Sequence, residues 1–238
     1  MTPPAVVHLT HWKAGSQWVR SVLRRAAPDR HFVSGLSGLP DVAFFPGAIY
    51  SPAYLTCERL DAWAGEGERR TFCVMRDLRD TLISWYFSLL NSHPDDAVGY
   101  VDRQRATLRS LDQESGIIHL LESDGMRDMV KMQRSWIARS APVFRYEDLV
   151  ADEHAVFGRI FDYCALDVPP ERRRSAIDEF TFERLAKRPR GDEDRSQHLR
   201  KGVAGDWRSH FTPAVKAAFK EHLGATLVAT GYEPGLDW

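Results

Sequence analysis

The opening of the chain decides the fold, because residues 5–18 read AVVHLTHWKAGSQW. The apolar run at its start is bounded by Pro3-Pro4 and by a polar, glycine-containing turn, which is typical of a buried strand of a parallel sheet. From Trp18 onward, apolar residues recur at helical spacing as far as Pro28. The opening therefore predicts a strand, a loop and a helix in succession.

The same succession returns twice further along the chain. Residues 71–75 form a second apolar run, followed by Asp77 as a helix N-cap and a helical pattern over 80–90. A third strand is expected over 142–144, with a helix over 153–164 after it. Strands that alternate with helices predict an α/β fold with a central parallel sheet flanked by helices, and binding at the carboxyl ends of the strands.

The rest of the chain shows further helices and one irregular segment. Residues 95–139 have helical periodicity without strand signals, and a last amphipathic helix is expected over 213–230. Between these two regions, residues 186–205 are polar and rich in Arg, Lys and Asp, with Pro189 and several glycines. This composition predicts a long mobile loop inside a single domain that spans residues 1–238.

The composition argues against several classes of protein. The chain has 238 residues, 43% of them hydrophobic, which is enough for one domain with a sizeable core. Its 32 Lys and Arg balance 33 Asp and Glu, so we expect neither a nucleic-acid partner nor an anionic membrane surface. The start lacks a signal-peptide pattern and no run of about 18 apolar residues occurs, so no membrane anchor is expected. Three well-separated cysteines favour a reducing compartment, and we expect a cytoplasmic protein.

Three basic segments are candidates for binding an anion. The first is residues 10–18, where backbone N–H groups at a helix start, Gly15 and Lys13 can together form a phosphate cradle. It is not a Walker A loop, because the Gly-x-x-x-x-Gly-Lys pattern does not occur. Taken alone, the segment also fits an ordinary surface loop.

The second segment, residues 76–84, follows the second predicted strand. Arg76 would leave the strand end toward the same crevice as Lys13, and Ser84 would lie about two helical turns further on. A capped helix with solvated surface charges is the alternative interpretation.

The third segment, residues 198–207, reads HLRKGVAGDW. Adjacent Arg200 and Lys201 before Gly202 could clamp a phosphate, the guanidinium in bidentate fashion and the ammonium as a point charge. A solvated basic run is the alternative interpretation here.

In this order, the three segments resemble the sulfotransferase family that uses 3′-phosphoadenosine 5′-phosphosulfate (PAPS) as sulfuryl donor. Residues 10–18 are similar to the family's phosphosulfate loop, and residues 76–84 to its 3′-phosphate segment. Residues 200–207 match its Arg-Lys-Gly-x-x-Gly-Asp-Trp segment without a break. Residues 145–149 and 231–233 also look like family landmarks. The resemblance covers nearly the whole chain and implies a three-layer architecture similar to that of P-loop nucleotide kinases.

The resemblance also implies a role for each matching residue. The groups expected at the 5′-phosphosulfate are Lys13, Ala14 through its backbone, Gly15, Ser16 and Gln17. Those expected at the 3′-phosphate are Arg76, Ser84, Arg200, Lys201 and Gly202. Trp18 and Phe182 would sandwich the adenine, with Tyr146 near its edge. The alternative interpretation is that Trp18 and Phe182 are ordinary core aromatics.

The family's general base has no counterpart in the same pattern. Many members carry a histidine in a Thr-His-Leu-Pro segment before the second basic segment, whereas residues 48–52 here read AIYSP. The identity of the base therefore stays open, and the candidates are Glu58, His31, His11 and Tyr50.

The resemblance implies transfer of a sulfuryl group from PAPS to a hydroxyl or amine of a small acceptor, leaving adenosine 3′,5′-bisphosphate (PAP). In such a loose, in-line transfer, we expect Lys13 to be catalytic by donating to the bridging oxygen of the leaving group. An apolar or aromatic acceptor is favoured, because a set of aromatic residues could line its pocket, with core packing as the alternative. This set is Phe44, Phe45, Tyr50, Tyr54 and residues 85–87. No metal is expected, because no Asp/His cluster has metal-ligand spacing. A homodimer is left open.

Two other functions remain at this point. A P-loop nucleotide kinase would share the sheet and the anion loop, but its Gly-Lys-Ser/Thr motif and magnesium-binding aspartate do not occur in order. A nucleotide-binding protein of the same fold with weak or lost catalysis is favoured by the missing histidine. Lys13 argues against it.

Overall fold

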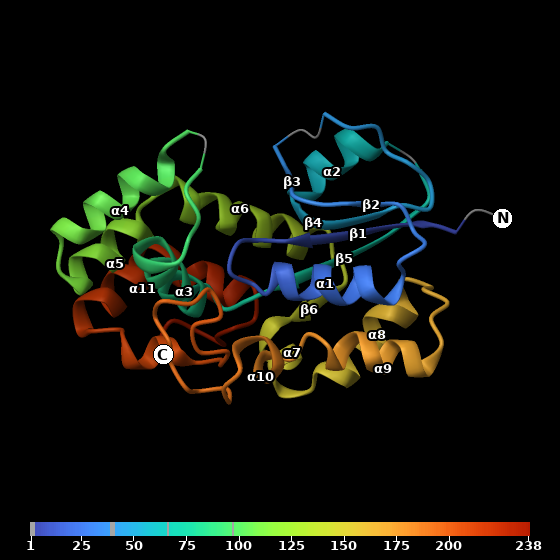
Figure 1. Cartoon of the computed structure of the whole chain (residues 1–238). Helices are drawn as coiled ribbons and strands as arrows, with labels where there is room; N and C mark the ends of the chain where they lie inside the picture. Colours follow the sequence, from blue (N-terminus) through green and yellow to red (C-terminus); the bar gives the residue numbers. More distant parts are fainter. Residues whose placement is uncertain (1–2, 39–40, 66, 97) are drawn as a thin grey trace. The chain divides into compact units, whose positions relative to one another are not determined.

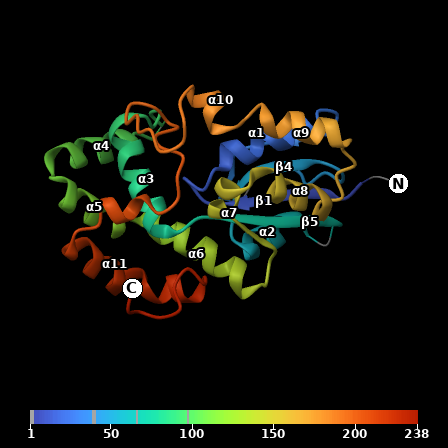
Figure 2. The ribbon, with the colours of Figure 1, turned by 90° about the horizontal axis from the view of Figure 1, so that it is seen from below.

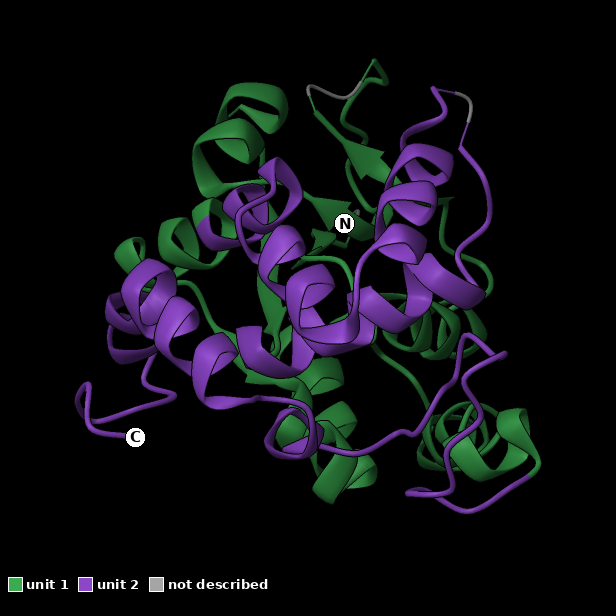
Figure 3. Ribbon diagram, turned by 90° about the vertical axis from the view of Figure 1, so that its left-hand side faces the viewer, with its two compact units in different colours: residues 1–76, 131–187 green, residues 77–130, 188–238 purple. Residues whose placement is uncertain are grey.

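The computed structural model describes residues 3–38, 41–65, 67–96 and 98–238. By its internal contacts the chain divides into two units (Figure 3). Unit 1 comprises residues 1–76 and 131–187, and unit 2 comprises residues 77–130 and 188–238. Each unit is thus assembled from two separate stretches of sequence.

Unit 1 contains a sheet in which every pair of neighbouring strands is parallel. The strands follow the order β2-β4-β1-β5-β6, and β3 pairs with β4 off this path. They are β1 (Ala5–Thr10), β2 (Phe32–Val33), β3 (Leu36–Ser37), β4 (Ile49–Tyr54), β5 (Arg69–Met75) and β6 (Val143–Arg145). Because β1 leads into the first basic segment and β5 into the second, both segments leave neighbouring strands at the same edge of the sheet.

Helices cover both faces of this sheet (Figures 1 and 2). One face carries α1 (Ser16–Ala26), α8 (Glu153–Tyr163) and α9 (Pro170–Asp178), and the other carries α2 (Cys57–Ala64). The unit also contains α7 (Tyr146–Ala151), α10 (Phe182–Ala186) and the second half of α6 (Asp124–Ala138). The predicted three-layer α/β fold with a central parallel sheet is confirmed.

The centre of the sheet is buried, which explains the apolar runs of β1 and of the second half of β5. All six residues of β1 are buried. The main core cluster packs Val6, Phe72 and Val74 of the strands against α1, α8 and α9. Burial of each such side chain contributes roughly 1.5–3 kcal/mol, so the sheet and these helices form one stable platform.

Unit 2 is helical in its described residues. Its elements are α3 (Leu78–Asn91), α4 (Tyr100–Ser110), α5 (Gln113–Leu121), the first part of α6, the 3₁₀-helix η1 (Asp206–Ser209) and α11 (Pro213–Ala229). The side chain of Asp77 caps α3, accepting a hydrogen bond from the Arg79 N–H as the sequence predicts. Residues 188–205 contain neither helix nor strand, whereas Ala186, the first residue of the predicted loop, is the last residue of α10. No helix in the described ranges is both long and apolar enough to cross a bilayer.

The sequence pattern does not predict β4, nor the short strands β2 and β3. Pro52 lies inside β4, although this strand has neighbours on both sides. The pairing with β1 shifts register between Val7 and Leu9, so the ladder is interrupted where the proline falls. Proline enters a sheet interior only at such irregularities, which is why the sequence signal is weak.

Candidate functional site

The loop between β1 and α1 is fixed at its base by His11. The Arg76 backbone N–H donates to Nε2 of His11 over 3.2 Å, and the Gln133 side-chain amide donates to the same atom over 2.8 Å. Gln133 also donates to the Arg76 carbonyl oxygen, at 2.7 Å. Because Nε2 accepts two hydrogen bonds, Nδ1 carries the proton and donates to the Trp12 carbonyl oxygen, 2.9 Å away. Both ring nitrogens of His11 are therefore used within unit 1.

His11 is also electrically neutral in the folded protein. Complete burial lowers the pKa of His11 from 6.5 to about 4, against the raising effect of its backbone hydrogen bonds. A neutral ring with fixed nitrogens serves to position the loop and the end of β5 relative to each other.

Lys13 and Gly15 form the turn that precedes α1. Lys13 has a left-handed backbone, with φ of 66°, and its carbonyl oxygen accepts a hydrogen bond from Nη1 of Arg76 over 3.1 Å. Gly15 is the N-cap of α1 with φ of 78°, and a Cβ there would lie 3.1 Å from the Tyr146 ring. The first turn of α1 has no acidic residue. A helix N-terminus flanked by lysine and arginine favours an anion.

The aromatic residues predicted for the adenine lie in the same unit. The Trp18 ring meets Tyr146 edge to face, with centroids 6.5 Å apart, and the Arg76 guanidinium lies 4.3 Å from the centre of the Tyr146 ring. Phe182 is buried and begins α10. Trp18, Tyr146 and Arg76 therefore gather beside the Gly15 turn.

Ser16 and its neighbours occupy the start of α1. The Tyr54 hydroxyl donates to Oγ of Ser16 over 3.1 Å, which links the end of β4 to this helix. Ala14 is completely buried, so only its backbone could serve a ligand, and Gln17 is exposed.

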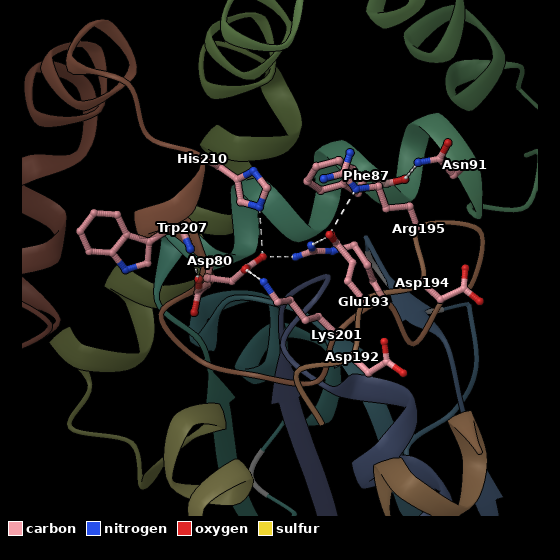
Figure 4. A network of polar contacts seen from close by, with 12 residues as sticks. Asp80, Phe87, Asn91, Asp192, Glu193, Asp194, Arg195, Lys201, Trp207 and His210 are labelled. Carbon is pink, nitrogen blue, oxygen red and sulfur yellow. Dashed lines mark hydrogen bonds and ion pairs between the residues drawn. The ribbon is translucent and has the colours of Figure 1, made fainter. Parts of the chain in front are cut away.

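In unit 2, the second and third basic segments are joined by Asp80 (Figure 4). Its carboxylate accepts hydrogen bonds from the backbone N–H groups of Gly205 and Trp207, at 2.6 and 2.9 Å. Asp80 is 1% exposed, so these are buried, charge-assisted hydrogen bonds. They hold the end of the irregular segment against α3.

Asp206 organises the basic side chains of the third segment. Its carboxylate pairs with Arg200 and with Nζ of Lys201, and His210 lies 3.4 Å away. Burial alone would raise the pKa of Asp206, but hydrogen bonds from these three partners hold it well below its ordinary value. Asp206 therefore stays charged and fixes Arg200 and Lys201.

Ser84 and Gly202, which are also expected at the 3′-phosphate, belong to unit 2, whereas Arg76 belongs to unit 1. Ser84 and Arg200 line one small pocket of unit 2, together with His198. Arg200 also pairs with Glu193, and Gly202 follows Lys201 with φ of 68°. The structure thus brings Ser84 and Arg200 together, as the two segments predict.

The base candidates other than His11 occupy different surroundings. The Tyr50 hydroxyl accepts a hydrogen bond from the Phe45 N–H over 2.6 Å, and its ring stacks on Phe44. His31 is exposed and meets the Phe45 ring edge to face. Glu58 is exposed in the first turn of α2. The identity of the base stays a prediction to be tested.

The aromatic residues expected in the acceptor pocket fall into separate groups. Phe44, Phe45 and Tyr50 contact one another in unit 1, as described above, whereas Tyr54 contacts the loop after β1. Residues 85–87 lie on α3 and are buried. Within residues 85–87, the Phe87 ring lies below the guanidinium of Arg200, whose central carbon is 4.7 Å from the ring centre.

Several functional contacts escape sequence reasoning. Gln133 stands in no motif, and Asp80 stands in the second basic segment, but the sequence does not reveal the distant partners of either residue. Asp206 could be noticed from the sequence, because it stands in the third basic segment, residues 198–207. Within the described part of the chain, no group of three or more His, Cys, Asp or Glu side chains could hold a metal ion.

Comparison with known proteins gives a consistent result. A family model described as "Sulfotransferase domain" matches residues 66–231. The chain is 24% identical over 177 residues to 3-alpha-hydroxysteroid sulfotransferase of Cavia porcellus, covering 69% of this chain and 57% of that protein. It is 23% identical over 164 residues to sulfotransferase 1A1 of Bos taurus, covering 63% and 52%. The chain thus spans about half the length of the curated relatives it matches.

Solved structures share the fold. Mouse sulfotransferase SULT7A1, solved in complex with PAP, matches with a TM-score of 0.68 and 18% identity, covering 94% of this chain and 84% of that one. Retinol dehydratase, solved with retinol and PAP, matches with a TM-score of 0.58 and 14% identity, covering 95% and 82%.

Proposed function

The chain belongs to the sulfotransferase domain family, and we propose that it transfers a sulfuryl group from PAPS to a hydroxyl or amine of a small, apolar or aromatic acceptor. Curated relatives are named as sulfotransferases, and two structures of the same fold were solved with PAP. The products would be the sulfated acceptor and PAP.

One observation carries this proposal. Lys13 stands in a left-handed turn at the N-terminus of α1, and its carbonyl oxygen is bonded to Arg76. The first turn of α1 has no acidic residue, so its backbone N–H groups beside Lys13 and Arg76 favour an anion. The residues present therefore fit a phosphosulfate group.

We assign the 5′-phosphosulfate to Lys13, Ala14, Gly15, Ser16 and Gln17. We assign the 3′-phosphate to Arg76, Ser84, Arg200, Lys201 and Gly202. The adenine would lie between Trp18 and Phe182, near Tyr146. The assignments are supported by the fixed positions of Arg76 on Tyr146 and of Arg200 and Lys201 on Asp206.

Lys13 would be the catalytic residue of this set. Sulfuryl transfer passes through a loose, in-line transition state in which negative charge builds on the leaving oxygen. An ammonium group held by the turn stabilises that charge without reorganisation. The base that accepts the acceptor's proton remains to be assigned among Glu58, His31, His11 and Tyr50, and an acidic phenol needs it least.

We also propose a cellular setting for the reaction from the state of the cysteines. Cys57, Cys73 and Cys164 are free and buried, which suits a reducing, cytoplasmic setting. We further propose that residues 186–205 form a loop that closes over the nucleotide within one sulfotransferase domain. The acceptor would be a small molecule, and a homodimer is open to test by light scattering.

Two measurements on the wild-type chain test the function. Isothermal titration with PAP should show one site with a micromolar or tighter dissociation constant. Sulfur-labelled PAPS, incubated with a panel of phenols, alcohols, amines and sugars, should label at least one acceptor. Binding of PAP without transfer to any acceptor would instead indicate a nucleotide-binding protein without catalysis. Failure to bind PAP would contradict the proposal as a whole.

A further inference from the structure

Tyr54 is the last residue of β4, and it contacts the loop after β1 on both sides of Lys13. Its hydroxyl donates to Oγ of Ser16 over 3.1 Å. Its ring meets the Trp12 ring, with centroids 5.8 Å apart. Tyr54 therefore contacts Trp12, which precedes the predicted catalytic Lys13, and Ser16, which follows it.

The hydrogen bond from Tyr54 determines what Ser16 can do. A serine hydroxyl has one proton and two lone pairs. Because Oγ accepts from Tyr54, the Ser16 proton is directed to a different acceptor. Ser16 is 7% exposed and begins α1, so its hydroxyl has few orientations to choose from.

The protonation state of Tyr54 supports its role as the donor in the hydrogen bond to Ser16. Burial raises the pKa of Tyr54, outweighing the lowering effects of Ser16 and Gln17. The phenol is therefore protonated at neutral pH and acts as a donor. The same property makes it a poor proton acceptor, so it does not replace the missing base.

We propose that Tyr54 is a positioning residue for sulfuryl transfer, which fixes the Ser16 hydroxyl so that its O–H points at the phosphosulfate. This role rests on the proposed function. A chain of two hydroxyls is polarised along its length, so the donor at its end is stronger than an isolated serine. A donor that is oriented before the reaction stabilises the developing charge at no cost in reorganisation.

The test is a double-mutant cycle on the full chain, with kcat for PAPS turnover and the dissociation constant for PAP as separate readouts. Tyr54→Phe should lower kcat about tenfold, the effect of one lost hydrogen bond. The dissociation constant for PAP should change less than about twofold, because binding uses many other groups. Tyr54→Phe in a Ser16→Ala background should lower kcat no further than Ser16→Ala alone.

Tyr163→Phe is the matched control. Its hydroxyl donates to the Thr71 carbonyl oxygen over 2.9 Å, so the substitution also removes one phenolic hydrogen bond in unit 1. It lies at the end of α8 and should leave kcat unchanged.

Two outcomes would overturn the role of Tyr54. Tyr54→Phe could keep wild-type kcat, or its effect could multiply with that of Ser16→Ala in the double variant. Both outcomes are read against a wild type that binds PAP and transfers the sulfuryl group. A wild type that does neither contradicts the proposed function itself, and with it this role, before any variant is compared.

Discussion

The Arg76 backbone N–H donates a hydrogen bond to Nε2 of His11, which joins the end of β5 to the loop after β1. Gln133 donates to the same nitrogen from α6, so three segments of unit 1 meet on one neutral ring. The position of the loop after β1 therefore depends on His11 remaining unprotonated.

Acidification should destabilise the protein through His11. Burial lowers the pKa of His11 from 6.5 to about 4, so between these pH values the unfolded chain binds a proton that the folded chain does not. The free energy of unfolding should therefore decrease as pH falls through this range, by up to roughly 3 kcal/mol from this residue. Burial lowers the pKa of His8 to about 3, so His8 should also decrease the free energy of unfolding as pH falls. Urea denaturation at a series of pH values measures the slope.

The His11 contribution can be separated with a variant. His11→Gln should show a shallower pH slope than the wild type, whereas His222→Gln, at an exposed position on α11, should keep the wild-type slope. An unchanged slope in His11→Gln would show that this residue does not control the acid response.

Loss of the Lys13 ammonium should reduce turnover more than binding. Lys13→Met removes the charge that is proposed to stabilise the leaving oxygen, at a cost of about 3 kcal/mol or roughly a hundredfold in kcat. Lys220→Met, on α11, removes an equivalent charge outside the site and should keep full activity. Steady-state kinetics with PAPS and calorimetry with PAP measure the two effects. Full turnover by Lys13→Met would contradict its catalytic role.

Phe182 offers a test of the adenine assignment. Stacking of one base on an aromatic ring contributes about 1–3 kcal/mol, so Phe182→Ala should weaken PAP binding about tenfold or more. Phe180→Ala, two residues earlier, removes a ring that packs on the main core cluster, and it should lower stability while leaving PAP affinity unchanged. Equal affinities of the two variants for PAP would rule out stacking by Phe182.

The contact between Asp80 and residues 205–207 should control local stability in unit 2. Asp80→Ala leaves the buried N–H groups of Gly205 and Trp207 without their carboxylate, at a cost of about 1–3 kcal/mol. Limited proteolysis should then cut faster between residues 188 and 205, where the chain has no regular secondary structure. Asp102→Ala breaks only an exposed ion pair with Arg105 and should leave the cleavage rate unchanged. Equal rates in both variants would show that Asp80 does not anchor the segment.

Local sequence patterns were sufficient for much of the fold. β1 and β5 could be predicted because burial on both faces makes a parallel strand a continuous apolar run. β4 could not, because Pro52 interrupts the pattern and only the register shift against β1 accommodates it. The short strands β2 and β3 have too few residues to show any period.

The candidate site was likewise only partly predictable from the sequence. Lys13 and Arg200 stand in contiguous motifs, so their chemistry is visible in the sequence. Gln133 reaches His11 across 122 residues and Asp80 reaches Gly205 across 125, and no periodicity relates such positions. The chemistry of Lys13 and Arg200 can thus be predicted from motifs, whereas the long-range contacts of Gln133 and Asp80 require coordinates.

The left-handed backbone at Lys13 should lower the stability of the fold, although the proposed activity needs a lysine there. A side chain in this conformation costs of order 1 kcal/mol, which glycine would avoid. Lys13→Gly should therefore keep or raise the melting temperature, measured by differential scanning calorimetry, while kcat falls roughly a hundredfold as in Lys13→Met. A thermally robust, slow variant of this kind would give substrate complexes a longer lifetime for crystallography.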